Sequence, residues 1–167
     1  MKSTEPAWRE AARAPMTRVI TDLIVHCTAT VEGRDHTVAD IRRWHKAQGW
    51  QDIGYHFIVH LDGTIEPGRP IATAGAHVAD HNAKSIGIVY VGGLDRNVKP
   101  KDTRTPEQKA AMVELLKALK LRWPKARIAG HRDYSPDKDG DGKVEPHEWL
   151  KACPCFDAGA EYAGLRP

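Results

Sequence analysis

Apolar runs bounded by turn-forming residues predict a series of short strands in this chain. The runs typical of buried strands cover residues 20–27, 54–60, 85–91 and 127–129. The Asp62-Gly63 pair is typical of a hairpin turn, so the second strand is expected to return through residues 64–66. These segments supply the strands of a β-sheet.

A helix is predicted after the first strand. Thr37 can cap its first turn, and Asp40 stands three positions on, where an acidic side chain completes a capping box. The helix is expected to end near Gly49. Its apolar residues share one face: Val38, Ile41 and Trp44.

A second helix is predicted from Thr105 to about Trp123. Thr105 and Gln108 form another capping box, with Pro106 in the first turn, and Pro124 marks the end. Its apolar side is expected to comprise Met112, Leu115, Leu116, Leu119 and Leu121. Strands that alternate with helices predict an α/β fold, with helices packed on a central sheet.

The length of 167 residues favours one domain with one core. Residues 1–18 are expected to form an N-terminal arm and residues 19–167 the domain. A short helix within the arm, around residues 7–13, is only weakly supported. Three cysteines are an odd number and argue against a disulfide framework, so the thiols are expected to be reduced.

Charge and hydropathy argue against a nucleic-acid-binding protein and against a membrane-spanning one. The net charge of +3 is small and basic residues alternate with acidic ones, which argues against a nucleic-acid partner. No apolar run approaches the ~18 residues of a membrane-spanning helix. Residues 1–15 lack the apolar centre of a secretory signal, so synthesis in a cytoplasm without a signal peptide is expected.

Three residues far apart in the chain can form a zinc site: His26, His131 and Cys153. Two imidazoles and a thiolate leave a fourth position for water, which is typical of a catalytic site. A histidine at a strand end is, by itself, more often only hydrogen-bonded. Spacing also does not decide between Cys153 and Cys155 as the sulfur ligand.

Residues 137–148 fit the twelve-position EF-hand loop, which predicts a structural Ca²⁺ site. The expected ligands are Asp137, Asp139, Asp141, the carbonyl of Lys143, and Glu148. In this interpretation the loop is an insertion, and the ion holds it so that the segment after it reaches the zinc. A solvated acidic surface loop is the alternative.

An ordered set of motifs, spread over residues 20–157, resembles the zinc N-acetylmuramoyl-L-alanine amidases. That family includes small phage lysozyme-type amidases and the peptidoglycan recognition proteins. The motifs that carry the resemblance are His26-Cys27-Thr28-Ala29-Thr30, Ile41-Arg42-Arg43-Trp44-His45-Lys46, Gly49-Trp50-Gln51-Asp52-Ile53-Gly54-Tyr55-His56-Phe57, Asp62-Gly63-Thr64, Gly75-Ala76-His77, His81-Asn82, Ser85-Ile86-Gly87-Ile88, Gly130-His131-Arg132-Asp133 and Lys151-Ala152-Cys153-Pro154. Each motif alone is weak, whereas the set in this order is specific.

The resemblance implies a central mixed β-sheet flanked by α-helices and cleavage of the amide between N-acetylmuramic acid and L-alanine in bacterial peptidoglycan. It implies zinc bound by His26, His131 and Cys153, since the ligand directly precedes the proline. Tyr55 matches the catalytic tyrosine and Lys151 the lysine that assists it in phage members. The residues expected to contact substrate are Trp50, His77 and Asn82.

A phage or prophage endolysin is the favoured role, because the chain is short and carries no recognisable wall-anchoring module. Such a protein would be a bacteriolytic, antimicrobial monomer that reaches the cell wall after release from the host cytoplasm. The alternative is a non-catalytic peptidoglycan-binding protein, although members with that role often lose the cysteine ligand. Three other histidines are expected to be structural or exposed: His45, His56 and His60.

Overall fold

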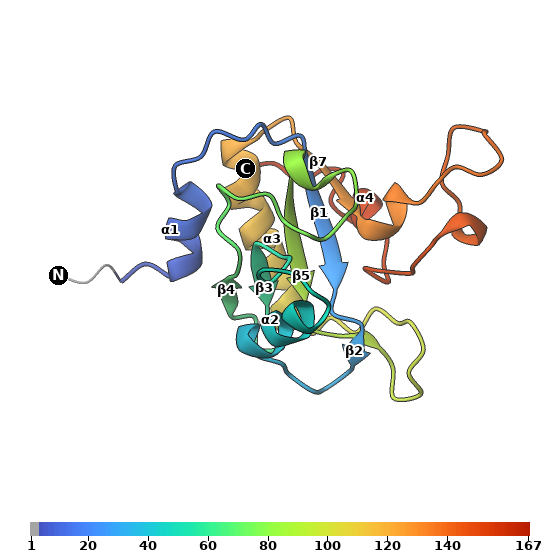
Figure 1. Cartoon of the computed structure of the whole chain (residues 1–167), viewed down its shortest axis with the longest axis horizontal. Coiled ribbons are helices and arrows are strands. Elements are labelled where there is room, and N and C mark those ends of the chain that lie inside the picture. The colour runs from blue at the N-terminus through green and yellow to red at the C-terminus, as the bar shows by residue number, and fades with distance from the viewer. Residues whose placement is uncertain (1–3) are drawn as a thin grey trace.

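The computed structural model describes residues 4–167, and its centre is a five-stranded sheet (Figure 1). The strands run in the order β4-β3-β5-β1-β7, and only the pairing of β3 with β4 is antiparallel. Their bounds are β1 Asp22–Cys27, β3 Phe57–Val59, β4 Ile65–Pro67, β5 Ser85–Tyr90 and β7 Arg127–Gly130. The predicted strands and the hairpin return are therefore confirmed, as is the mixed sheet that the resemblance implied.

Within residues 4–167, four α-helices accompany the sheet: α1 Ala7–Arg13, α2 Val38–Ala47, α3 Pro106–Arg122 and α4 Ala158–Glu161. Both predicted capping boxes are present. The Thr37 hydroxyl accepts the Asp40 N–H, and the Thr105 hydroxyl accepts the Gln108 N–H. Three short 3₁₀ turns complete the helical elements: η1 Asn82–Lys84, η2 His131–Tyr134 and η3 Pro146–Glu148. No helix in residues 4–167 combines the length and the hydrophobicity that crossing a bilayer requires.

The two long helices cover opposite faces of the sheet (Figure 1). Alternate residues of β1, Leu23, Val25 and Cys27, join the larger apolar cluster on the α3 side. The residues between them point to the α2 side, where Ile58 and Val89 pack against α2. The same alternation places His26 on the α2 side, so the sheet directs this imidazole away from the main core.

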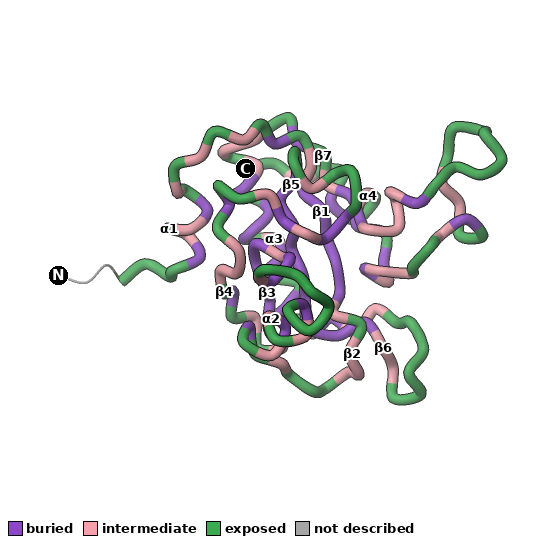
Figure 2. The backbone as a smooth tube through the Cα atoms, in the orientation of Figure 1, coloured by how far each residue is buried: buried purple, intermediate pink, exposed green. Residues whose placement is uncertain are grey.

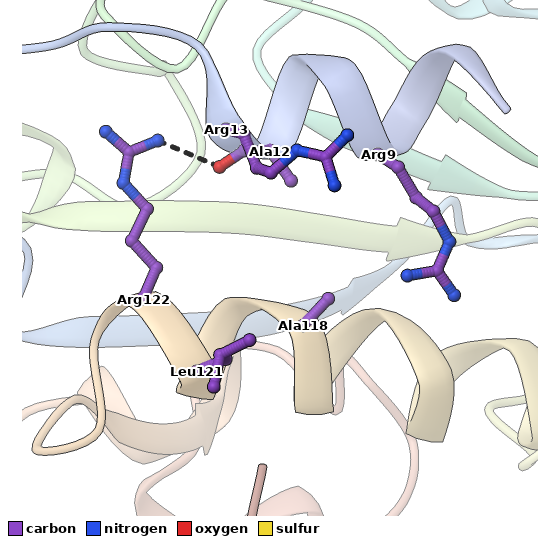
Figure 3. Close-up of a pocket in the computed structure, with 6 residues that line it drawn as sticks. All are labelled: Arg9, Ala12, Arg13, Ala118, Leu121 and Arg122. Carbon is purple, nitrogen blue, oxygen red and sulfur yellow. Dashed lines mark hydrogen bonds between the residues drawn. The ribbon is translucent and has the colours of Figure 1, made fainter. Parts of the chain in front are cut away.

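The segment expected to be an arm contributes helix α1, which lies against α3 and β4. Trp8 and Ala12 are buried in the main core. Arg122 of α3 donates a hydrogen bond of 2.9 Å to the Ala12 carbonyl (Figure 3) and another of 2.9 Å to the Ala14 carbonyl. Residues 1–3 of the predicted arm lie outside the described residues. The segment is thus packed on the domain at least along α1.

One prediction for α3 is wrong. Leu121 was expected on the buried side, but it is 74% exposed and borders a groove of about 510 Å³ between α1 and α3 (Figure 3). Leu121 follows the buried Leu119 by two positions, roughly 200° around the helix, so it lies off the apolar stripe that faces the sheet.

Two further contacts lie outside the five-stranded sheet. A two-stranded parallel pair joins β2 Thr30–Val31 to β6 Gly93–Leu94. The Arg104 guanidinium, just before α3, stacks on Phe156 and pairs with Asp102 and Glu161. By contrast, the 137–148 loop projects from the domain and is mostly exposed (Figures 1 and 2).

Candidate metal centre and active site

Three side chains from distant parts of the chain meet on the α2 side of the sheet. His26 lies near the end of β1, His131 directly follows β7, and Cys153 lies beyond η3. One ligand atom from each lies within 4.8 Å of the others. The Cys153 sulfur is 3.8 Å from His26 Nδ1, and the rings of His26 and His131 have centroids 4.8 Å apart.

The backbone fixes the thiol of this cluster. The Cys27 N–H donates to Cys153 Sγ at 3.3 Å, and the Arg132 N–H donates to the Cys153 carbonyl at 2.8 Å. A Cβ at Gly130 would lie 2.6 Å from the Pro154 ring, so only glycine lets the segment carrying Cys153 approach β7 this closely. The glycine of the Gly130-His131 motif is therefore a packing requirement of the site.

His77 orients His26 by contacting Nε2, the ring nitrogen that faces away from Cys153. The two rings share a 2.9 Å hydrogen bond between His26 Nε2 and His77 Nδ1, and His77 Nε2 lies 3.2 Å from the Ser85 hydroxyl. If His26 offers its Nδ1 lone pair to a metal, its proton sits on Nε2 and is donated to His77. His77 then carries its own proton on Nε2 and donates it to Ser85.

The electrostatic surroundings keep these imidazoles neutral. Burial lowers the pKa of His26 well below its usual value, and the nearby His77, His131 and Lys151 lower it further. Burial, with a contribution from Lys151, lowers the pKa of His131 to about 4. At neutral pH both rings therefore present lone pairs, which is the protonation state that metal binding requires.

A pocket of about 260 Å³ opens beside the cluster, and both predicted catalytic residues line it. The Tyr55 ring centroid is 5.1 Å from that of His26, and burial raises the pKa of the Tyr55 phenol. Tyr55 is therefore a hydroxyl donor at neutral pH. Lys151 adds a positive charge to the same pocket, as its lowering of the pKa of His26 and His131 shows.

Of the three residues expected to contact substrate, two line this pocket and one does not. Trp50 lines the pocket with 36% of its surface exposed, and His77 lines it while mostly buried. Asn82 instead lies behind His77. Its side-chain oxygen accepts the backbone N–H groups of His77 and Val78 at 2.9 and 3.0 Å, which holds the loop that carries the His77 ring.

His45 is a pocket residue that the sequence did not single out. It is 8% exposed, lines the pocket and stacks beside Trp50 with a centroid separation of 4.6 Å. Its Nδ1 accepts the Gly54 N–H at 2.9 Å and so fixes the backbone next to Tyr55. The available signal was its helical spacing of four from Ile41, which placed it on the buried face of α2.

The predicted calcium loop brings three carboxylates together. Single oxygens of Asp137, Asp139 and Asp141 lie within 4.8 Å of one another, and Asp137 accepts the Gly142 N–H at 2.8 Å. Glu148 is buried and accepts backbone N–H groups of the loop from Lys138, Asp139 and Glu145. The loop is thus closed on itself, with the Glu148 carboxylate bonded to its backbone.

Comparisons with known proteins point in one direction. The family described as N-acetylmuramoyl-L-alanine amidase matches residues 16–148, which leaves Lys151 and Cys153 just beyond the match. The chain is 43% identical to the endolysin of Enterobacteria phage K11 over 80% of this chain and 79% of that protein. It is 40% identical to the endolysin of Escherichia phage T7 over 84% of each chain.

Solved structures agree on the fold. The N-acetylmuramoyl-L-alanine amidase LysC from Clostridium intestinale superposes with a TM-score of 0.67 at 27% identity, over 91% of this chain and 90% of that one. The match of residues 16–148 and the identity to the phage proteins extend over most of the sequence. The chain therefore belongs to the N-acetylmuramoyl-L-alanine amidase family.

Proposed function

We propose that this peptidoglycan amidase is zinc-dependent and cleaves the amide between N-acetylmuramic acid and the L-alanine of the stem peptide. The observation that carries the zinc dependence is the meeting of His26, His131 and Cys153 within 4.8 Å beside a pocket. Two neutral imidazoles and one sulfur are ligands that zinc prefers, and a three-ligand site leaves a position for water or substrate.

The chemistry requires an activated water and stabilisation of a developing oxyanion. Zinc held by these residues would lower the pKa of a bound water toward ~7 and polarise the scissile carbonyl. The Tyr55 hydroxyl, kept protonated by burial, donates a hydrogen bond to the oxyanion. The Lys151 ammonium, which lines the same pocket, stabilises the same negative charge.

His77 and Asn82 act in this proposal by positioning the first ligand. The hydrogen bond from His26 to His77 selects the tautomer of His26 that leaves Nδ1 free. Asn82 fixes the backbone of His77. Trp50 presents an exposed ring at the pocket, where it can contact the sugar or the peptide of the substrate.

The biological role we propose is that of an endolysin. Support comes from the phage relatives, which are themselves endolysins and align over about four fifths of their length. On this proposal the chain is a bacteriolytic monomer that acts on the cell wall after release from the host cell.

Digestion of purified peptidoglycan tests the reaction. The zinc-loaded protein should release new L-alanine amino termini, detected by labelling and mass spectrometry, and a chelator should abolish the release until zinc is returned. Unchanged digestion after complete removal of zinc would contradict the zinc dependence. Binding to the wall without release of amino termini would instead favour the non-catalytic alternative.

We also propose that the 137–148 loop binds one structural Ca²⁺. The proposal is supported by the twelve-position match and by the close approach of Asp137, Asp139 and Asp141. Binding through the side chain of Glu148 would require its carboxylate to exchange backbone N–H partners for the ion. Calorimetric titration with Ca²⁺ should show one site that is lost in Asp137→Ala. An equal heat in that variant would contradict the assignment.

A further inference from the structure

A second pocket lies at the opposite end of α2 from the active site. Its volume is about 280 Å³, and it separates the loop before α2 from the β3–β4 hairpin. Thr37, the cap of α2, lines this second pocket, whereas His45 near the other end of α2 lines the catalytic one. Three carboxylates and a buried imidazole line it as well: Asp35, Asp62, Glu66 and His60.

His60 has an unusual pair of neighbours. Its side chain is 8% exposed, and its Nδ1 lies 3.2 Å from Asp35 Oδ1 in a hydrogen bond. Its Nε2 lies 3.0 Å from Glu66 Oε1, but the geometry is not that of a hydrogen bond. Within residues 4–167, the Nε2 atom is buried and has no hydrogen-bond partner.

At Nε2 the ring lies beside a carboxylate but has no hydrogen-bond partner among the described residues. Asp35 accepts the Nδ1 proton, so the neutral ring carries a bare lone pair on Nε2. Glu66 Oε1 lies 3.0 Å from this atom, off the direction in which a ring N–H would point, and the two electron-rich atoms repel unless a cation binds both. Two atoms at this separation can both bind one metal at about 2.0–2.2 Å.

Asp35 already supports His60 in the way that is typical of a metal-binding histidine. A carboxylate that accepts the other ring proton of a ligating histidine fixes the tautomer and raises the basicity of the ring, and Asp35 makes this contact here. Asp62 lines the same pocket. The Thr64 N–H lowers the pKa of its carboxyl group, which keeps it ionised at neutral pH.

We propose that His60 Nε2 and the Glu66 carboxylate form a second divalent transition-metal site, with Asp62 of the same pocket available as a further ligand and water completing the shell. Imidazole and carboxylate together suit Zn²⁺ or a similar ion. The ion would fix the His60 ring, whose hydrogen bond to Asp35 joins the hairpin to the loop before α2; the other end of α2 walls the catalytic pocket. Its role would be to hold α2 in place.

The most direct test measures the number of zinc ions bound per chain. Protein is saturated with Zn²⁺ in excess Ca²⁺, which fills the 137–148 loop, then passed through a desalting column and analysed for zinc per chain. Wild type should hold two zinc ions, whereas His60→Gln and Glu66→Gln should each hold one and keep amidase activity. Asp35→Asn should weaken the second site about 10–100-fold. Glu66 has a half-exposed side chain, so its variant keeps the test valid if His60→Gln unfolds.

Two controls separate this site from the others. His147 is an exposed imidazole within 3.9 Å of Asp139 and Glu145, so His147→Gln measures zinc bound adventitiously there. Cys153→Ser should lose the catalytic zinc and retain the second one, which distinguishes a failure of this inference from a failure of the catalytic assignment. One zinc in wild type, or loss of the second zinc in His147→Gln but not in His60→Gln, would overturn the proposal.

Discussion

Cys153 and Cys155 stand two positions apart, yet their sulfur atoms have different surroundings. Cys153 Sγ faces His26 Nδ1 at 3.8 Å, whereas Cys155 Sγ lies 3.3 Å from the Gly93 carbonyl and 3.9 Å from Cys27 Sγ. The contact with Cys27, followed by burial, raises the pKa of the Cys155 thiol. The structure thus offers only one of the two sulfurs to the histidine pair.

Replacing these two cysteines one at a time should separate their roles. Cys153→Ser removes the sulfur donor and should lower zinc affinity by at least about 100-fold, since losing even a second-shell partner costs 10–100-fold. Turnover should fall with it. Cys155→Ser is the matched control and should keep both zinc and turnover. Zinc content by elemental analysis, alongside wall digestion, checks both expectations, and full activity in Cys153→Ser would refute the ligand assignment.

Tyr55 should affect turnover without affecting metal. Tyr55→Phe removes a donor aimed at the oxyanion, and we expect turnover to drop by about 10²–10³ while zinc content stays at the wild-type level. Lys151→Ala should behave in the same direction. Tyr162→Phe, on the α3 side of the sheet, serves as the control. If zinc content falls in step with activity, the role given to Tyr55 is wrong.

At the scale of elements, α3 shows how closely burial follows position along a helix. Leu116 is fully buried, whereas Leu121 is 74% exposed on the groove beside α1. Leu116→Ala should therefore lower the free energy of unfolding by about 2–5 kcal/mol through lost burial and a cavity. Leu121→Ala should change it by no more than about 0.5 kcal/mol. Urea unfolding of the two variants makes the comparison, and equal losses would contradict the packing of α3.

The sequence predicted the elements whose signals are local. Thr37 and Thr105 marked the two long helices because a cap depends on residues only three positions away. The pair β2–β6 and helix α4 were not predicted, since elements of two to four residues have no measurable period. Leu121 was misplaced because it was grouped with the other leucines by composition, whereas the helical period places it away from the face of Leu115 and Leu119.

The part of the site that the sequence predicted is the set of residues that stand in recognisable motifs. His26, His131 and Cys153 could be proposed together from their motifs, and the structure brings them within ligand distance. The bond from His26 to His77 and the place of His45 could not be predicted, because they depend on how rings from separate elements approach one another.

For the whole molecule, buried neutral histidines set the response to acid. Burial lowers the pKa of His26 and His77 well below the usual value, and that of His56 and His131 to about 4. In the unfolded chain these groups titrate near 6.5, so between pH 6.5 and 4 the unfolded state binds more protons. Stability is therefore full above pH 6.5 and is lost as the pH falls through this window.

The urea midpoint of the metal-free protein should be flat above pH 7 and fall steadily from about pH 6.5 to 4. Each such imidazole contributes a slope of at most about 1.4 kcal/mol per pH unit. His56→Gln should have a shallower slope than wild type, whereas His147→Gln, an exposed histidine, should match it. A midpoint that is constant from pH 6.5 to 5 would disprove this account.

The wide spacing of the metal-binding residues also has a consequence for timing. His26 and Cys153 are 127 positions apart, so the strand that carries His26 is synthesised well before Cys153. A nascent chain on the ribosome therefore has no complete cluster until residue 153 has emerged from the exit tunnel. On the proposed assignment, a translation product that stops before this codon lacks the sulfur ligand and should be catalytically silent.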